Sequence, residues 1–272
     1  MANFCPNHDV IPLKEVSEPQ RFSFTCHKDN IISKLIGLFF GRYITTPPIQ
    51  MIIDKGYALA VFFPSDGFPD SSSHLDLYEF APDNDTRWGA IGAWAWQTAV
   101  LAKYLDQDTR FSKTIAYGHS RYGKSALLAA AYDETIDGVI AHQSGTGGAS
   151  LSRNKPGETV EAITKQYPHW FTPNYSEDNI TLDQHYLLSL IAPRPILLGN
   201  AKRDVWSDPE GSFRAAKGAT PIYELYGSAG LEQEKLNEFN PNADLAFWIR
   251  PGTHGVVKED WPAFLAFLDA HF

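Results

Sequence analysis

The chain has few cysteines and no long apolar run. Cys5 and Cys26 are the only cysteines among 272 residues. Two thiols this far apart do not match a zinc site of known spacing, and both a disulfide and two free thiols remain open. No apolar stretch approaches the length of a membrane span, and residues 1–5 have neither the basic nor the apolar region of a signal peptide. The sequence therefore predicts a soluble chain.

Basic residues are also scarce. The 23 Lys and Arg residues are outnumbered by 32 Asp and Glu residues, which gives a formal net charge of -9 at pH 7. No basic run is present, so a nucleic acid or an anionic membrane would be repelled over most of the surface. We expect neither as a partner, and the sequence leaves the oligomeric state open.

Length and pattern favour one α/β domain over residues 1–272, because 43% of the residues are hydrophobic and the expected strands and helices alternate. Such alternation is typical of a mostly parallel sheet covered on both faces. The expected strands are Tyr57–Phe63, Thr114–Tyr117, Gly138–His142, Pro195–Asn200 and Ala246–Arg250. The expected helices are Trp88–Leu105, Ser125–Tyr132, Gln184–Ile191 and Trp261–Phe272, with Ile222–Tyr226 as a short strand or a helix end and 150–183 rich in loops.

Ser120 lies between an expected strand and an expected helix, in the segment Gly118–Lys124 of sequence GHSRYGK. A serine on such a tight turn has its hydroxyl lifted clear of the sheet and close to helix-end N–H groups. The second glycine follows the serine by three residues, where the usual G-x-S-x-G nucleophile elbow has it two residues later. Ser120 is a candidate nucleophile, and the alternative is a glycine-flanked turn with a helix-capping serine.

Asp204 and His254 each follow an expected strand as well. Ligands of open α/β sheets bind at the carboxyl ends of the strands, and the chain order Ser, Asp, His is that of an α/β-hydrolase triad. We predict that His254 takes the proton of Ser120 during attack and returns it to the leaving alcohol.

Asp208 is a rival to Asp204 for the carboxylate that orients His254. Both lie in the segment Arg203–Pro209. An aspartate directly before proline also fits a helix cap, with the proline at the first helical position. Asp204 is nearer the strand end and is the preferred candidate.

Short motifs that occur in a specific order extend over most of the chain. They are Asp54–Ala58, Gly92–Trp96, Gly118–Lys124, Ser144–Ala149, Gly157–Thr159, Phe171, Asp183–His185, Ile191–Pro195, Asp204–Pro209 and Thr253–Gly255. In this order they resemble the glucuronoyl esterases of carbohydrate esterase family 15, particularly the bacterial members. The resemblance implies an α/β-hydrolase fold, a three-layer αβα sandwich with a mostly parallel sheet. Family members have further strands ahead of the segment that residues 3–8 resemble, so we expect a sheet trimmed or reorganised at its N-terminal edge.

The resemblance implies roles for four further side chains. Arg121 would help to form the oxyanion hole through its backbone N–H and its guanidinium. Lys124 and Glu158 would bond hydroxyls of a glucuronate ring, and Trp206 would provide an apolar wall. The alternatives are a solvated helix residue for Lys124, a helix-start carboxylate for Glu158 and a core side chain for Trp206.

The chain departs from some family members, notably fungal ones, at Gln143. Those members place the triad acid directly before the Ser-Gly-x-Gly-Gly stretch, where this chain has an amide. Because an amide does not stabilise an imidazolium as a carboxylate does, the acid role should pass to Asp204.

The resemblance implies an ester hydrolase that acts through an acyl-enzyme, without a metal or an organic cofactor. Its substrate would be an ester of (4-O-methyl-)glucuronic acid in plant cell-wall polysaccharide, as in linkages between lignin and glucuronoxylan. Such a substrate implies a secreted or periplasmic enzyme. Two alternatives remain: another carboxylesterase, such as a xylan acetyl esterase, and a catalytically impaired carbohydrate-binding homologue.

Overall fold

A computed structural model of the chain describes residues 38–41, 47–73, 88–153 and 156–272. The chain divides into two compact units, Met1–Val61 with Gly255–Leu265 and Phe62–His254 with Ala266–Phe272. The second unit holds the sheet and every candidate site residue. A single domain over residues 1–272 stays a prediction, and Cys5 and Cys26 lie outside the described residues.

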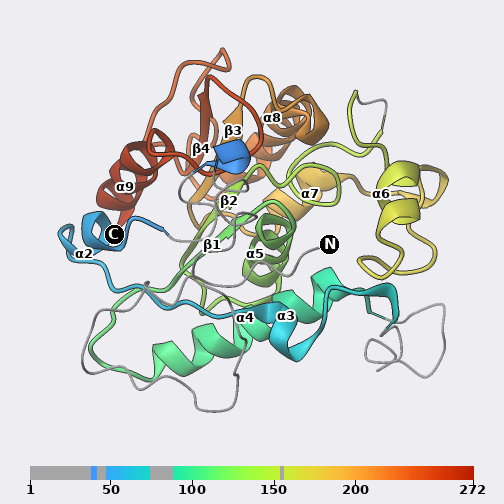
Figure 1. Cartoon of the computed structure of the whole chain (residues 1–272). Helices are drawn as coiled ribbons and strands as arrows, with labels where there is room; N and C mark the ends of the chain where they lie inside the picture. The colour runs from blue at the N-terminus through green and yellow to red at the C-terminus, as the bar shows by residue number, and fades with distance from the viewer. Residues whose placement is uncertain (1–37, 42–46, 74–87, 154–155) are drawn as a thin grey trace. The chain divides into compact units, whose positions relative to one another are not determined.

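The second unit is built on a parallel sheet with the strand order β1-β2-β3-β4 (Figure 1). The strands are β1 (Ile115–His119), β2 (Gly138–His142), β3 (Ile196–Ala201) and β4 (Leu245–Arg250). Every residue of β2 and β3 is buried, as expected for parallel strands with both faces covered. The α/β class and the parallel sheet are confirmed, and these four strands lie close to their predicted positions.

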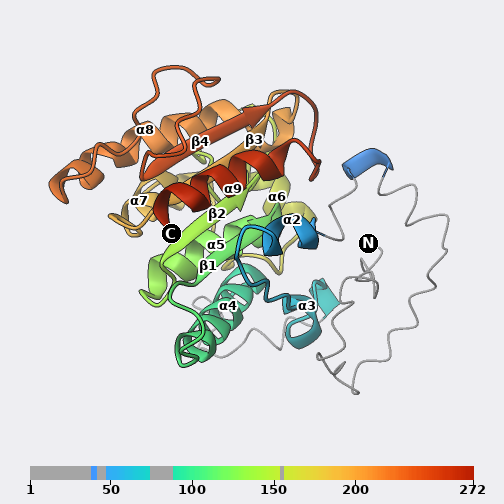
Figure 2. The same cartoon turned by 90° about the vertical axis from the view of Figure 1, so that its left-hand side faces the viewer.

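The helices of the described residues include long ones that pack on the sheet and short ones in its connections. They include α2 (Ile49–Ile53), α3 (Pro64–Gly67), α4 (Ala90–Asp106), α5 (Arg121–Tyr132), α6 (Val160–Gln166), α7 (Gln184–Ser189), α8 (Pro209–Leu225) and α9 (Asp260–His271), with short 3-10 helices η3 (Glu177–Asn179) and η4 (Val205–Ser207). Figures 1 and 2 both show α4 running beside α5. Of the two interpretations of residues 222–226, the helix end is confirmed, because α8 ends at Leu225.

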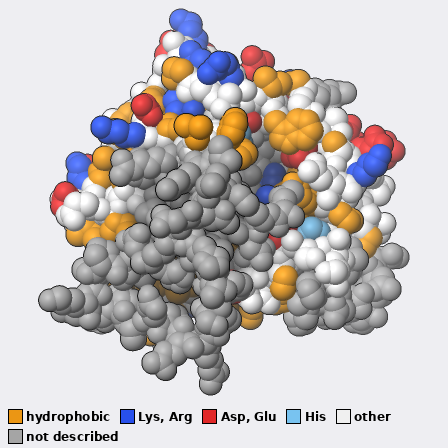
Figure 3. Space-filling model, viewed as in Figure 1, with side chains coloured by type: hydrophobic (Ala, Val, Ile, Leu, Met, Phe, Trp, Pro, Cys, Tyr) orange, Lys and Arg blue, Asp and Glu red, His pale blue; other side chains and the backbone are white. Residues whose placement is uncertain are grey.

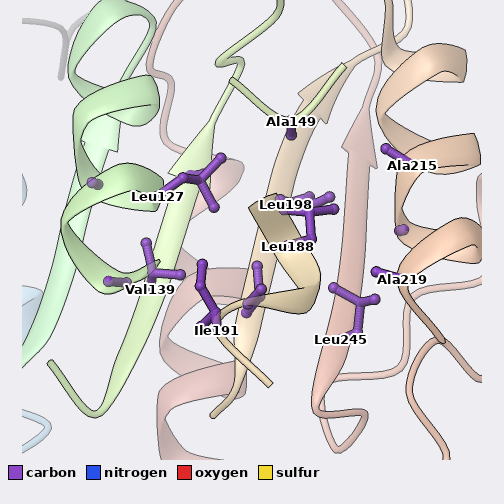
Figure 4. Close-up of a cluster of buried hydrophobic side chains, with 14 of the residues drawn as sticks. Leu127, Val139, Ala149, Leu188, Ile191, Leu198, Ala215, Ala219 and Leu245 are labelled. Atoms are coloured by element: carbon purple, nitrogen blue, oxygen red, sulfur yellow. The ribbon is translucent and has the colours of Figure 1, made fainter. Parts of the chain in front are cut away.

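Helices α5, α7 and α8 share one hydrophobic core with the strands (Figure 4). Leu127 of α5 and Leu188 of α7 are fully buried against it. Ala215 and Ala219 of α8 are also fully buried, and their small side chains let this helix lie close to β4. Burial of each large side chain contributes about 1.5–3 kcal/mol, so this core fixes the strand ends that carry the site.

The expected strand at Tyr57–Phe63 is wrong. The segment has no regular secondary structure, and Leu59, Val61 and Phe63 are 37%, 45% and 40% exposed. An apolar run becomes a strand only where a neighbouring strand takes up its backbone N–H and C=O groups. Among the described residues, β1 pairs with β2 alone and offers this segment no ladder.

The register of the sheet aligns the carboxyl ends of the strands. His119 on β1 lies opposite His142 on β2, and Ala201 on β3 lies opposite Arg250 on β4. Parallel strands in register end at the same edge, where open α/β sheets bind their ligands. The turns after the four strands, which carry the candidate residues, therefore meet at one edge.

The close approach at Gly118 yields a prediction for stability. A Cβ at this position would overlap the carbonyl oxygen of Tyr122 and the backbone of Gly123. Because backbone atoms do not move aside cheaply, we expect Gly118→Ala to lower the free energy of unfolding by about 1–3 kcal/mol or more. Urea unfolding followed by circular dichroism measures this loss.

Gly92 in α4 provides the matched control. The nearest atom to a Cβ there is the Cβ of Trp88 at 4.0 Å, which is ordinary contact. Alanine is favoured over glycine inside a helix, so Gly92→Ala should raise stability by about 0.5–1 kcal/mol. Equal stability of the two variants would contradict the tight packing of the turn.

Candidate active site

Ser120 has a strained backbone, with φ 56° and ψ -122°. Its N–H donates to the carbonyl of His142 at 2.8 Å, and its carbonyl accepts from the N–H of Gly123 at 2.9 Å, so the turn is held on both sides. Its side chain makes no capping hydrogen bond to α5, and the helix-capping alternative is therefore wrong. Strain of about 1–3 kcal/mol at a non-glycine residue persists where the surrounding structure imposes it, commonly at functional sites.

Gly123 explains the departure from the usual elbow spacing. A Cβ at this residue would lie 3.0 Å from the carbonyl oxygen of Gly118 and 3.1 Å from the Cβ of Ser144. The glycine three residues after Ser120 thus allows the first turn of α5 to pass close to the turn that follows β2. The glycine stands one residue later than in the usual elbow, but the close packing of helix against strand that it allows is the same.

Asp204 and His254 form the central hydrogen bond of the site. His254 Nδ1 lies 2.7 Å from Asp204 Oδ2, with the imidazole 27% exposed and the carboxylate 2% exposed. The N–H of Ser207 donates to the other carboxylate oxygen at 3.3 Å. Burial alone would raise the pKa of Asp204, but the hydrogen bonds and charge of His254 and the bonds from Ser207 lower it below its usual value. The carboxylate is thus ionised at neutral pH and faces the imidazole.

Asp208 has a different role. Its Oδ1 accepts the N–H of Gly211 at 2.9 Å, and its Oδ2 accepts the hydroxyl of Ser150 at 3.1 Å. It caps α8, with Pro209 as the first helical residue. The structure brings Asp204 to His254 and places Asp208 at a helix cap.

His119 connects the turn of the serine to the histidine. The ring of His119 lies 4.7 Å from the ring of His254 between centroids, and its Nδ1 lies 3.3 Å from Nδ1 of His142. Burial lowers the pKa of His119 well below its usual range, and the charges of His142, His254 and Arg250 act in the same direction. A neutral imidazole therefore packs on His254.

No hydrogen bond joins the Ser120 hydroxyl to His254 in the described part of the chain. Both residues nonetheless lie at the same edge of the sheet, where the ring of His119, the residue directly before Ser120, contacts the ring of His254. Catalytic hydrogen bonds are commonly long before substrate binds and tighten in the complex.

Gln143 supports the loop of His254. It has φ 49°, and its Nε2 donates to the carbonyl of Thr253 at 3.3 Å. Arg250 Nη2 donates to the same carbonyl at 3.2 Å. The amide of Gln143 thus braces the residue next to His254.

Arg121 is the first residue of α5, and its guanidinium pairs with the carboxylate of Asp70. The guanidinium also lies over two rings, 4.8 Å from the centroid of Trp170 and 5.6 Å from that of Tyr167. Sequence reasoning missed Asp70, because an aspartate between Pro69 and serines is typical of a turn and carries no signal of its own.

Lys124 is only 3% exposed, so the alternative of a solvated helix residue is wrong. Its Nζ donates to the carbonyls of Ser144 at 2.5 Å and Thr146 at 2.6 Å. It thereby ties the glycine-rich loop after β2 to α5, beside Ser120.

Glu158 and Trp206 form a pair at the same edge. Glu158 Oε1 accepts the indole N–H of Trp206 at 3.0 Å, and the backbone N–H of Glu158 donates to the carbonyl of Trp206 at 3.1 Å. Trp206 is 54% exposed, so the core alternative is wrong. Thr159, not Glu158, caps α6. The pair offers a flat apolar surface beside a buried carboxylate.

The described residues contain no group of three or more His, Cys, Asp or Glu side chains that could hold a metal ion. Within the same residues, no helix has both the length and the apolar character needed to cross a membrane. On the face in Figure 3, the Lys and Arg side chains are scattered among acidic and apolar ones.

Comparison with known proteins gives a consistent result. A family model described as fungal glucuronyl esterase matches residues 44–227. "Carbohydrate esterase MZ0003" from an unknown prokaryotic organism is 36% identical over 99% of this chain and 66% of its own length. A 4-O-methyl-glucuronoyl methylesterase of Phanerochaete carnosa is 32% identical over 51% of this chain and 38% of its own.

Solved structures agree with these relatives. The structure of a promiscuous CE15 esterase from the marine bacterial metagenome has a TM-score of 0.80 and 34% identity. The match covers 99% of this chain and 72% of that one. Of the two curated relatives named above, the chain spans under two thirds of the length: 66% of the prokaryotic esterase and 38% of the Phanerochaete carnosa methylesterase.

Proposed function

Because the chain belongs to the glucuronoyl esterases of carbohydrate esterase family 15, we propose that it hydrolyses esters of glucuronic acid. One observation carries the proposal: the 2.7 Å bond between His254 and Asp204 lies at the sheet edge where Ser120 is held in a strained turn. A nucleophile, a base and an orienting carboxylate from three strand ends are what acyl transfer requires.

The first step forms an acyl-enzyme. His254 takes the proton of the Ser120 hydroxyl, and the oxygen attacks the ester carbonyl carbon of the uronate. The tetrahedral intermediate then collapses, the bond to the alcohol breaks, and His254 gives the proton to the leaving oxygen. Asp204 holds the imidazole in the tautomer that accepts at Nε2 and stabilises the imidazolium.

The second step releases the acid. Water replaces the alcohol, His254 takes a proton from it, and the resulting hydroxide attacks the acyl carbon. Collapse breaks the bond to the Ser120 oxygen, which recovers its proton from His254, and glucuronic acid leaves. No metal or organic cofactor enters either step.

Arg121 would stabilise the oxyanion of both intermediates. Its backbone belongs to the residue after the nucleophile, which supplies one oxyanion-hole N–H in α/β-hydrolases. Its guanidinium adds a charged donor beside the same turn, where a developing negative charge gains most in a site shielded from water.

Lys124, Glu158 and Trp206 would bind the sugar. Both charged side chains are buried, and charged hydrogen bonds to hydroxyls are strong in such a place. Trp206 is held by its bond to Glu158, so its exposed ring forms a fixed apolar wall. The methylesterase relative is named for 4-O-methyl-glucuronoyl esters, and we propose the same acyl group in plant cell-wall polysaccharide for this chain. Such a substrate implies action outside the cytoplasm.

A broader ester specificity is the second candidate, because the solved relative is described as promiscuous. The sugar site separates the two candidates. An enzyme for uronate esters needs it, whereas an enzyme for small acyl esters, such as acetyl groups on xylan, needs only the triad.

The test compares benzyl glucuronate with a phenyl acyl ester in Trp206→Ala. We expect kcat/KM for the glucuronate ester to fall about 10-fold, because a sugar loses its stacking surface worth about 1–1.5 kcal/mol. Hydrolysis of the acyl ester should change less than about 2-fold, because that reaction needs only the triad. A tenfold change in rate corresponds to about 1.4 kcal/mol. Initial rates over a range of substrate concentrations give both values.

Tyr132→Ala is the matched control for this test. Tyr132 is 80% exposed at the last residue of α5, far along the helix from Ser120. Both ester activities should stay unchanged in this variant. A preference of the unmodified enzyme for the acyl ester, together with no effect of Trp206→Ala, would favour the broad esterase.

A further inference from the structure

The carboxylate of Asp70 joins residues from two distant parts of the chain. Its Oδ2 pairs with the guanidinium of Arg121, and its Oδ1 lies 2.7 Å from both Nε2 of His169 and Nε1 of Trp170. Burial would raise the pKa of Asp70, but the bonds and charges of His169, Arg121 and Trp170 lower it. An ionised carboxylate thus accepts from three donors in a mostly buried place.

The segment that carries Asp70 is anchored to α4. The indole N–H of Trp94, which is fully buried, donates to the carbonyl of Phe68 at 2.8 Å. The ring of Trp94 also packs on Tyr122, at 5.2 Å between centroids. Asp70 is therefore held on the same support as the first turn of α5.

The guanidinium of Arg121 also contacts a pair of stacked rings. Tyr167 and Trp170 stack at 3.8 Å between centroids with an interplanar angle of 4°, and the guanidinium lies over both. The Arg121 side chain is 20% exposed and that of Asp70 is 17% exposed. Trp170 also donates a hydrogen bond to Asp70. The ring and the carboxylate that contact the Arg121 guanidinium therefore hold each other in place.

We propose that Asp70 is a positioning residue that holds the Arg121 guanidinium in the orientation in which it stabilises the oxyanion. The inference rests on the proposed esterase function. An arginine has many rotamers, and ordering it at the moment of reaction would cost free energy. A donor that is ordered beforehand avoids this cost, which is why preorganised donors dominate oxyanion stabilisation. The aromatic pair restricts the plane of the guanidinium, and the carboxylate fixes its direction within that plane.

The decisive experiment is a double-mutant cycle between Asp70→Asn and Arg121→Ala, with benzyl glucuronate as substrate. Asparagine keeps the size and one accepting oxygen, but removes the charge that faces the guanidinium. We expect Asp70→Asn alone to lower kcat about 10- to 100-fold, below the cost of deleting a whole oxyanion donor, with KM changed less than about 3-fold. In the Arg121→Ala background, the same change should alter kcat less than about 2-fold.

Equal losses in the two backgrounds would overturn the inference, because a merely structural Asp70 would cost the same with or without Arg121. Wild-type kcat in Asp70→Asn would overturn it as well. If that variant fails to fold by circular dichroism, Asp70→Glu decides, since it keeps the charge and moves the carboxylate by one methylene. It should then lose kcat while its melting temperature stays near that of the wild type, and full kcat would reject the role. Failure of the esterase proposal looks different, because the unmodified chain would then be no faster than Ser120→Ala.

Discussion

Ser120→Ala should abolish hydrolysis of glucuronate esters, with kcat lowered by about 10⁴- to 10⁶-fold. Without the hydroxyl no acyl-enzyme forms, and the residual rate comes from substrate binding and from the oxyanion donors. Alanine fits the backbone at φ 56° no worse than serine, so the fold should be unchanged. Release of benzyl alcohol from benzyl glucuronate, followed over hours at high enzyme concentration, measures the loss.

Ser189→Ala is the control for this variant. Ser189 lies in α7, and its hydroxyl donates to the carbonyl of His185 at 2.8 Å, within the helix. Its removal should leave kcat unchanged. A chain that binds glucuronoxylan fragments but turns over no ester, with or without Ser120, would instead be the catalytically impaired carbohydrate-binding homologue.

The strands that carry the site could be predicted because each is a short apolar run that ends in turn residues. Tyr57–Phe63 has the same composition, and its prediction as a strand is wrong. The composition of a segment shows whether its side chains suit a buried strand. It does not show whether a neighbouring strand is present to form the backbone hydrogen bonds. For β2 and β3 those neighbours exist on both sides, and for the described residues at 57–63 they do not.

Site residues were predictable where a strand end and a chemical type coincide. Ser120, Asp204 and His254 follow strands whose carboxyl ends lie at the same edge of the sheet, and the loop after β4 brings the ring of His254 to that of His119. Asp70 follows no strand, and its importance comes from Arg121 and Trp170, which are 51 and 100 residues away in sequence. Contacts over such separations depend on the packed fold, so no local pattern reports them.

The choice between two aspartates also needed the structure. Asp204 and Asp208 are four residues apart, and both lie near the end of β3. The 3-10 helix η4 between them turns the first toward His254 and the second toward the start of α8. The left-handed backbone of Asp208, with φ 51°, fits the cap that its side chain makes.

Asp204→Asn should lower kcat about 10⁴-fold while the fold persists, which is the second large effect that we expect. The carboxylate accepts Nδ1–H of His254 and so leaves Nε2 free to take the proton of Ser120. An amide that donates to Nδ1 would impose the opposite tautomer and would not stabilise the imidazolium. In the unmodified enzyme the pKa of Asp204 is lowered below the usual aspartate value of about 3.9. The carboxylate is therefore ionised near neutral pH, and its protonation does not limit activity there.

Asp208→Asn tests the assignment directly with the same chemical change four residues away. Asparagine caps helices as well as aspartate and tolerates the left-handed backbone, so α8 should keep its start and kcat should fall less than about 3-fold. Kinetics of both variants on benzyl glucuronate, with thermal unfolding of each, separate the two residues. A large loss of kcat in Asp208→Asn, with full activity in Asp204→Asn, would assign the role of the triad carboxylate to Asp208. It would also mean that the 2.7 Å bond to His254 plays no part in the reaction.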